Sequence, residues 1–311
     1  MRISKRWMLH RVSILAAFFA AAVVSAQDGG VEIFSGMTIF ESGSRTSLSH
    51  LYSRRGSLFS GSDEVPNSED SSMEEHRAVF GFTHGVTPAL SLSLLLPVLR
   101  KESSFQDELG ETQRRRSEGL GDAALLGKYR FFSEYWSQSA FHVAAFGGLE
   151  LPTGSSKERY GDVFLPFSMQ PGSGSVDAFG GVVLTLSIAR FRFDALALYK
   201  ANNEGSRDFS EGDFFVLGTS FAYRFYHAKY PGPSASAKVG LSWRQEDPDE
   251  LAGAVVDDTG LSELRLIAGL TYHPYPEIDL VASVEVPVYG DYDGEQLGLD
   301  VRTFFGFGIR F

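Results

Sequence analysis

The sequence contains no cysteine among its 311 residues. This absence excludes disulfide frameworks, thiolate metal sites and a lipid anchor attached through a cysteine. Positive charge is also scarce, because 28 Lys and Arg residues stand against 39 Asp and Glu residues and leave a formal net charge of -11. A nucleic-acid partner requires a basic face. We therefore expect no nucleic-acid partner, and a fold that is held by packing and hydrogen bonds alone.

Long apolar runs are absent after residue 26, so the sequence predicts no membrane-spanning helix there. The first 26 residues differ: basic residues precede an apolar run at 12–24, and Val24-Ser25-Ala26 offers a small-residue cleavage site. The run is shorter than the about 20 residues that a spanning helix needs, which disfavours an uncleaved anchor. We interpret 1–26 as a cleaved signal peptide and 27–311 as the exported domain.

After residue 26, apolar and polar residues alternate over segments of about ten residues. In the last segment, Val301, Thr303, Phe305, Phe307, Ile309 and Phe311 share one face, and Arg302, Phe304, Gly306, Gly308 and Arg310 share the other. The same parity holds at 191–199, 215–225, 235–243, 264–272 and 280–288. One strand face that meets lipid and one that meets a polar lumen produce this pattern. It predicts an all-β, transmembrane, antiparallel up-and-down β-barrel.

The number of strands follows from the remaining segments. Earlier strands are predicted at 75–85, 89–99, 122–132, 139–151 and 175–188, and a first strand with poor alternation at 31–40. Bacterial barrels of this type have even strand numbers, which gives about twelve strands. Short connections are predicted at 86–88, 133–138, 189–190, 227–233 and 274–277, and they alternate with longer polar loops at 41–74, 100–121, 152–174, 201–212, 245–261 and 290–298. Both chain ends then lie on the periplasmic side.

A soluble β-sandwich or lipocalin-like barrel is the alternative, because alternation also marks half-buried soluble strands. In a soluble barrel the outer face carries charges, whereas here one face of most strands is uncharged, with Tyr, Trp and Phe near its ends. The ending Phe307, Ile309 and Phe311 looks like the C-terminal signal that the barrel-assembly machinery reads. We expect the outer membrane of a Gram-negative-type bacterium, with its lipid and lipopolysaccharide as surroundings.

Three sequence blocks carry a family resemblance. They are Gly119-Leu120-Gly121-Asp122 with Lys128-Tyr129-Arg130-Phe131, then Gly148-Leu149-Glu150-Leu151-Pro152-Thr153-Gly154, then Pro171-Gly172-Ser173-Gly174-Ser175-Val176-Asp177. Together with Tyr223-Arg224-Phe225 they resemble the MetA-pathway of phenol degradation family over 119–226, and more loosely to 311. The resemblance implies an outer-membrane barrel linked to uptake of small, often aromatic or apolar compounds. The segment 41–74 has no counterpart in it.

The predicted register places a set of charged and polar side chains in the lumen. They are Arg77, Lys128, Arg130, His142, Glu150, Asp177, Arg192, Asp194, Arg224, Lys238, Arg244, Glu263, Arg265, Glu285 and Arg302. Charged rings set pore selectivity, so one interpretation is a polar channel that favours anionic or polarisable solutes. The other is a network of Arg and carboxylate pairs that fills the barrel. A barrel of about twelve strands lies between the filled and the open sizes, and both interpretations stay open.

Catalytic and metal-binding residues are hard to assemble from this sequence. Outer-membrane phospholipases use Ser, His and a polar orienter, but His142 and His273, on lumen faces, lie in no segment that resembles a His-x-Ser-Asn-Gly block. Spacing at 246–250 and 257–258 does not match a calcium loop, and we interpret it, like the arginine run 114–116, as solvated charge. We expect no enzyme, no cofactor and no metal site.

The sequence therefore predicts a channel or transporter for small-molecule solutes, of aromatic or apolar character by the resemblance. The alternative is a structural or surface-binding barrel with a closed lumen that acts through its outer loops.

Overall fold

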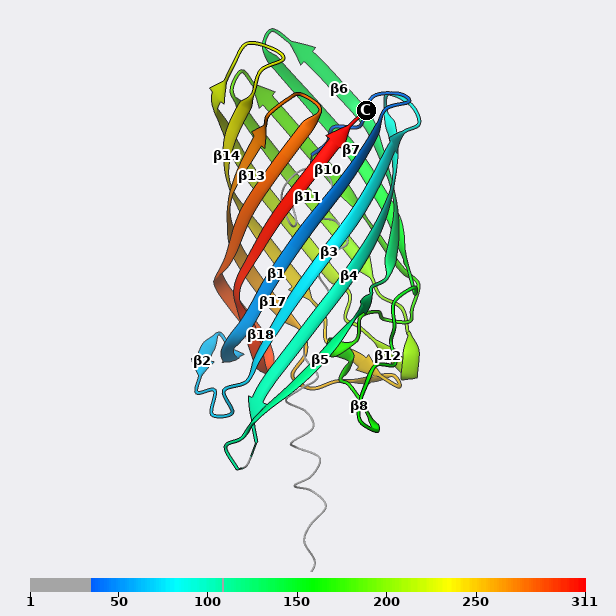
Figure 1. The fold of residues 1–311 in the computed structure, drawn as a ribbon, viewed down its shortest axis with the longest axis vertical. Coiled ribbons are helices and arrows are strands. Elements are labelled where there is room, and N and C mark those ends of the chain that lie inside the picture. Colours follow the sequence, from blue (N-terminus) through cyan, green and yellow to red (C-terminus); the bar gives the residue numbers. More distant parts are fainter. Residues whose placement is uncertain (1–34, 108) are drawn as a thin grey trace, which may run out of the picture.

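The computed structural model describes residues 35–107 and 109–311, so the predicted signal peptide lies outside the described residues. The chain forms an antiparallel β-barrel (Figure 1). Its wall follows the order β18, β17, β14, β13, β11, β10, β7, β6, β4, β3 and β1, and β1 pairs with β18 to close it. The bounds are β1 Ser44–Gly61, β3 Ser72–Gly85, β4 Leu90–Gln106, β6 Ala123–Trp136, β7 Ser139–Leu151, β10 Asp177–Ile188, β11 Phe191–Ala201, β13 Phe214–His227, β14 Ser234–Glu246, β17 Leu261–His273 and β18 Ile278–Arg310.

Strand β18 crosses the wall twice. Residues 280–292 pair with β17, and residues 295–310 pair with β1. The two ends of the strand lie together, because the Arg310 amide donates to the Glu277 carbonyl oxygen at 2.8 Å. Between the two parts, Gly294 has a φ of 77°, a conformation that glycine adopts without strain. Over the described part of the chain the wall therefore has twelve crossings, in agreement with the predicted number.

The short strands lie outside this path. β2 (Asp63–Val65) pairs with β1, and β5 (Thr112–Leu120) pairs with β4. The loops contain the pair β8 (Arg159–Tyr160) and β9 (Val163–Phe164), and the small sheet of β12 (Phe209–Ser210), β15 (Glu250–Leu251) and β16 (Ala254–Val255). Two 3-10 turns, η2 (Phe167–Met169) and η3 (Ser206–Asp208), complete the elements. Among the described residues, no helix is long and apolar enough to cross a membrane.

The first strand of the wall differs from the prediction. Residues 31–34 lie outside the described residues, residues 35–40 form no strand, and the first strand is β1, inside the predicted loop 41–74. The inner face of β1 is built largely from serines and arginines, and its outer face carries His50 and Arg54. Neither face is a continuous apolar stripe, so the strand has the composition of a polar loop. The predicted number of strands was right although one strand was misplaced.

The predicted loop 100–121 is largely strand as well. β4 continues to Gln106 and pairs with β5 through residues 98–106 and 112–120. The outward side chains there are charged. Arg100 Nη2 lies 3.3 Å from Glu102 Oε2, and Arg116 forms an ion pair with Glu118. A hairpin that extends beyond the apolar band meets water on its outer face, so its alternation of apolar and polar residues disappears. Of the described residues in 100–121, Asp107, the three residues 109–111 and Gly121 lie outside the two strands.

The two ends of the barrel differ in their connections (Figure 1). At the turn end, where Ser44 and Phe311 exchange backbone hydrogen bonds of 2.7 and 2.9 Å, the links are short, as predicted. At the opposite end, the loop end, the long connections 152–176, 202–213 and 247–260 gather with β2, β8 and β12. Long loops were predicted at this end.

The outer surface of the barrel is apolar, which is the central feature of the predicted architecture. Leu266 is 38% exposed and Phe305 is 58% exposed, whereas Arg265 and Arg302 on the same strands are each 2% exposed. A soluble barrel has the opposite arrangement. The parity expected for a transmembrane barrel is confirmed.

Candidate functional site in the lumen

The structure places the fifteen predicted lumen residues on the inside of the barrel. Ten of them are buried: Arg77, Lys128, His142, Asp177, Asp194, Arg244, Glu263, Arg265, Glu285 and Arg302. Four more line a cavity at the turn end: Arg130, Arg192, Arg224 and Lys238. The last, Glu150, contacts a buried lysine at the loop end. The residues are divided between two ends and one wall of the lumen, so they do not form a single site.

One wall of the lumen is apolar, which the sequence analysis did not predict. Its buried residues come from seven neighbouring strands, β3, β4, β6, β7, β10, β11 and β13; we call them the apolar wall: Val79, Leu95, Ala124, Leu126, Ala144, Phe146, Phe179, Val183, Leu196, Leu198, Phe214 and Val216. The sequence analysis expected a polar lumen, and this part of the lumen is apolar. Parity places Leu196 and Leu198 on the inward face of β11 together with Asp194, but it does not show that the inward apolar residues of neighbouring strands gather into one wall.

The opposite wall is ionic and pairs its charges locally. Arg265 forms an ion pair with Glu263, and Arg244 Nε lies 2.9 Å from Glu246 Oε2. Each pair joins two residues of one strand that are separated by a single outward residue, because side chains i and i+2 share a face. Tyr292 also donates to Glu263 Oε1 at 3.0 Å. Buried charges need such partners, and each of these two pairs supplies one within its own strand.

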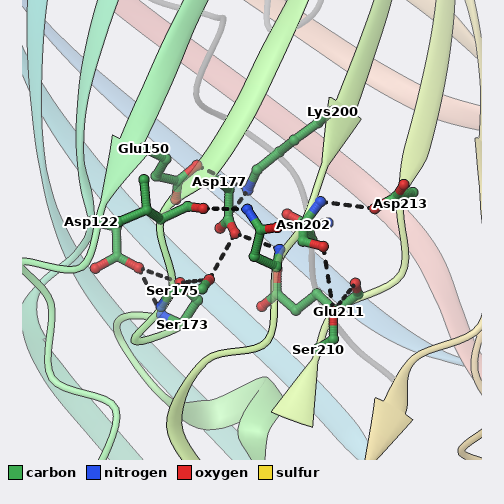
Figure 2. Close-up of polar contacts among 12 residues, drawn as sticks. Asp122, Glu150, Ser173, Ser175, Asp177, Lys200, Asn202, Ser210, Glu211 and Asp213 are labelled. Carbon is green, nitrogen blue, oxygen red and sulfur yellow. Dashed lines mark hydrogen bonds and ion pairs between the residues drawn. The ribbon is translucent and has the colours of Figure 1, made fainter. Parts of the chain in front are cut away.

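A polar network closes the apolar wall at the loop end (Figure 2). Asp122 Oδ1 accepts the amide of Gly154 at 2.8 Å, and its Oδ2 accepts the amide and the hydroxyl of Ser173 at 2.7 and 2.9 Å. One buried carboxylate thus fixes both ends of loop 152–176 to the start of β6. The three blocks that carried the family resemblance meet here, although they are separated in the sequence.

Two glycines, Gly154 and Gly172, explain why these three blocks are rich in glycine. A Cβ on Gly154 would lie 2.9 Å from the backbone of Gly121 and of Gly172. A Cβ on Gly172 would lie 2.6 Å from Asp122 Oδ1. Side chains cannot approach so closely, so the three segments can meet only where side chains are absent.

Lys200 lies at the centre of the same network, which contains side chains from β7, β10 and β11 (Figure 2). Its Nζ lies 2.9 Å from Glu150 Oε2 and 3.6 Å from Asp177 Oδ2. Asp177 also accepts the hydroxyl of Ser175 at 2.7 Å and the amide of Asn203 at 2.9 Å. Asp177 is fully buried, so its charge depends on these donors.

A segment of loop 152–176 lies inside the barrel near this network. We call residues 165–170, which include η2, the loop-end segment. Lys101 Nζ donates to the carbonyl oxygen of Gln170 at 2.6 Å, and Met169 packs in a buried apolar cluster with Met73. The sequence analysis placed Lys101 in an outer loop. Lys101 has the same parity as Leu99 and Ser103, and this parity was a signal that β4 continues with Lys101 facing inward.

The loops at this end carry two carboxyl groups with altered acidity. Desolvation raises the pKa of Glu211 to about 8, with a contribution from Asp249 and Glu150 that the charges of Lys200 and Lys101 oppose. Desolvation also raises the pKa of Asp249 to about 7. The folded loops therefore bind these protons more tightly than the unfolded loops do. The protonated carboxyl groups therefore stabilise the folded loops. This stabilisation is complete at a pH below the ordinary pKa range of carboxyl groups, and it is lost as the pH rises through about 7 to 8.

We expect the loops 202–213 and 247–260 to open more readily at pH 9 than at pH 5. Amide hydrogen exchange, corrected for its intrinsic pH dependence, measures the opening. The variant Glu211→Gln should lose most of the change above pH 7, because the titrating group is gone, whereas Glu250→Gln on the exposed loop surface should keep it. Equal pH dependence in the two variants would contradict this assignment.

A second segment occupies the lumen at the turn end. We call residues 35–40 the N-terminal segment. The Gly36 amide donates to Thr185 Oγ1 at 2.9 Å, Lys128 Nζ donates to the Ser35 carbonyl oxygen at 3.2 Å, and the Ile39 amide donates to Ser91 Oγ at 3.0 Å. These contacts reach β10, β6 and β4 from inside the barrel. The stretch predicted as part of a wall strand therefore fills the lumen.

A cavity of about 760 Å³ lies between the N-terminal segment and the wall of β11, β13, β14 and β17. Six of the predicted lumen residues line it, as do Met37, Ile39 and Phe40 of the N-terminal segment. We call it the turn-end chamber. Its volume is in the range of small-molecule binding sites in proteins.

One histidine contacts a serine hydroxyl inside the barrel. His142 Nδ1 lies 2.8 Å from Ser133 Oγ, which is the contact of a nucleophile and a base. The charged side chains that act on this imidazole are Arg130 and Arg192, and neither can take the role of the acid in a triad. Within residues 35–107 and 109–311, no group of three or more His, Asp or Glu side chains could hold a metal ion.

Comparisons with known proteins support the architecture. No family model and no curated protein matches the sequence, so the family resemblance stays a prediction. Among solved structures, the chain is similar to the COG4313 outer membrane channel from Pseudomonas putida F1, with a TM-score of 0.67 and 14% identity over 92% of this chain and 100% of that one. It is also similar to the β domain of the Bordetella autotransporter Brka (TM-score 0.45, 11% identity, 87% and 100% covered) and to a Pseudomonas aeruginosa FadL homologue (0.42, 8%, 96% and 99%). At this identity, the first likeness shows the fold: an outer-membrane β-barrel.

Proposed function

We propose that this barrel takes up small solutes of aromatic or apolar character across the outer membrane. The apolar wall is the observation that carries the proposal. A channel for hydrophilic solutes needs polar groups around its whole lumen, because each solute exchanges hydration for wall contacts. Here buried Phe, Leu and Val side chains cover the strands from β3 to β13. The resemblance to the MetA-pathway of phenol degradation family and the fold shared with an outer membrane channel agree with this role.

The two inserted segments make the passage gated. The N-terminal segment occupies the turn end, and the loop-end segment occupies the other. The N-terminal segment is held by hydrogen bonds to side chains of the wall, and the loop-end segment is held by such bonds and by the packing of Met169 against Met73. In this proposal the turn end is periplasmic, the outer rim meets lipopolysaccharide, and the outward-facing Phe307, Ile309 and Phe311 are the signal for the barrel-assembly machinery.

The alternative is a closed barrel that binds a surface ligand through its loops. The occupied lumen favours it, because both segments are bonded in place. The turn-end chamber argues against it, since binding through the outer loops does not require a cavity of about 760 Å³ at the opposite end.

Uptake by cells that lack their general porins tests the proposal. We expect expression of the protein to raise the uptake rate of labelled toluene and to leave that of a monosaccharide unchanged. The variant Leu198→Ser, which adds a polar group to the apolar wall, should reduce toluene uptake while the barrel still migrates as a folded species in gels. Toluene uptake equal to that of cells without the protein would contradict the proposal, and so would a parallel increase for the monosaccharide.

A further inference from the structure

The turn-end chamber has an unusual balance of charge for an acidic protein. Of the described residues, eight Arg and Lys side chains and three carboxylates line it, whereas the whole chain has a net charge of -11. The cationic excess is therefore local to this cavity. It lies within a confined space of about 760 Å³, where charges act on a solute more strongly than on an open surface.

Two of the three carboxylates are already engaged by arginines. Asp279 Oδ2 lies 2.7 Å from Arg45 Nη2, and Asp279 Oδ1 lies 3.9 Å from Arg310 Nη2. Asp194 accepts two hydrogen bonds from Arg192 Nε, at 2.9 and 3.0 Å. The eight cations therefore outnumber the three carboxylates, and they include Arg224 on β13 and Lys238 on β14.

The N-terminal segment adds apolar side chains to the chamber. Met37, Ile39 and Phe40 line it, and Phe40 is 60% exposed. An exposed aromatic ring and basic groups together form a site with two different halves. A solute that matches it has an apolar body and a negative group.

We propose that the turn-end chamber binds organic anions that have an apolar body, such as aromatic carboxylates. The carboxylate lies toward Arg192, Arg224 and Lys238, and the ring lies against Phe40 and Met37. Charge-assisted hydrogen bonds from Arg and Lys hold the anion, and the apolar half distinguishes it from inorganic anions. This inference rests on the proposed function, because it specifies which of the small aromatic solutes the inner end of the path retains.

Binding of two probes that differ only in charge tests the inference. The probes are 4-fluorobenzoate and the neutral 4-fluorobenzamide, with fluorine NMR of the purified protein in a non-ionic detergent and a detergent-only blank. We expect the protein to bind the benzoate about tenfold more tightly than the benzamide, and the benzoate affinity to decrease with added salt. Equal affinities for the two probes would overturn the inference.

Variants identify the groups responsible. The double variant Arg224→Gln/Lys238→Gln should weaken benzoate binding about tenfold and leave benzamide binding unchanged. The matched control, Arg100→Gln/Arg116→Gln, removes two cations from the outer face of the loop-end hairpin and should change neither affinity. Phe40→Ser should weaken both probes by similar factors. Benzoate binding that survives the first double variant, in protein shown by its gel migration to be folded, would place the anion elsewhere.

The uptake experiment separates this inference from the proposed function. If the cells take up toluene but the protein binds benzoate no more tightly than benzamide, the anion site in the chamber is overturned and the proposed function stands. Benzoate binding at the chamber without uptake of any aromatic solute supports the anion site and overturns the channel.

Discussion

Replacing Lys200 with methionine should lower the free energy of unfolding by about 3–5 kcal/mol, because a buried pair that loses one partner leaves an uncompensated charge. The lysine side chain is 6% exposed, and its two partners, Glu150 and Asp177, are 13% and 1% exposed. Neither carboxylate can move to water without dismantling the loop-end network. Urea unfolding of the barrel in lipid vesicles, followed by the change in gel migration, measures the loss.

The exposed pair Arg116–Glu118 provides the control for this variant. Its side chains are 49% and 63% exposed, and surface ion pairs contribute about 0–1 kcal/mol. Arg116→Met should therefore have little effect. The double variant Lys200→Met/Glu150→Gln should recover part of the lost stability, because one unpaired carboxylate is removed. A loss for Lys200→Met as small as that for Arg116→Met would show that the network does not stabilise the barrel.

Replacing Leu266 with arginine should cost about 2–4 kcal/mol, because the side chain faces lipid near the middle of β17. Its 38% exposure is exposure to hydrocarbon in the membrane, where a guanidinium group loses its hydration. Arginine at Thr271, on the same strand, is the matched control, since Thr271 lines the turn-end chamber and a long side chain there reaches water. Its cost should be much smaller.

The comparison between these two positions tests the orientation of the strands. If both arginines cost the same in urea unfolding in vesicles, the outer face of the barrel is not in contact with hydrocarbon.

Alternation in the sequence predicted the outside of the barrel well, because lipid imposes one requirement on every outward residue. Leu266, Phe305 and Phe307 are outward, and Arg265 and Arg302 are inward, as expected. The same rule failed for β1, whose inner serines and outer His50 do not contrast in polarity. It also failed where β4 and β5 extend beyond the apolar band, because water meets their outer face there. Parity detects strands only inside the membrane.

The inside of the barrel could be predicted only in part. Charged side chains such as Arg244 and Glu263 face inward because lipid excludes them, so their placement follows from charge. Phe179 shares its parity with Asp177, and Leu198 shares its parity with Lys200, so parity places both inward, but only the three-dimensional register brings them together in one wall. The two inserted segments depend on contacts between residues far apart in sequence, such as Gly36 with Thr185, which no local pattern encodes.

Single-channel recording in planar bilayers tests most directly whether the lumen is a path that the two inserted segments close. We expect the intact protein to be nearly silent. A variant that lacks residues 35–40 and has glycine and serine in place of residues 165–170 should open in steady steps, after its gel migration has shown that it folds. Wide, steady conductance by the intact protein, or silence of the folded variant, would contradict the account.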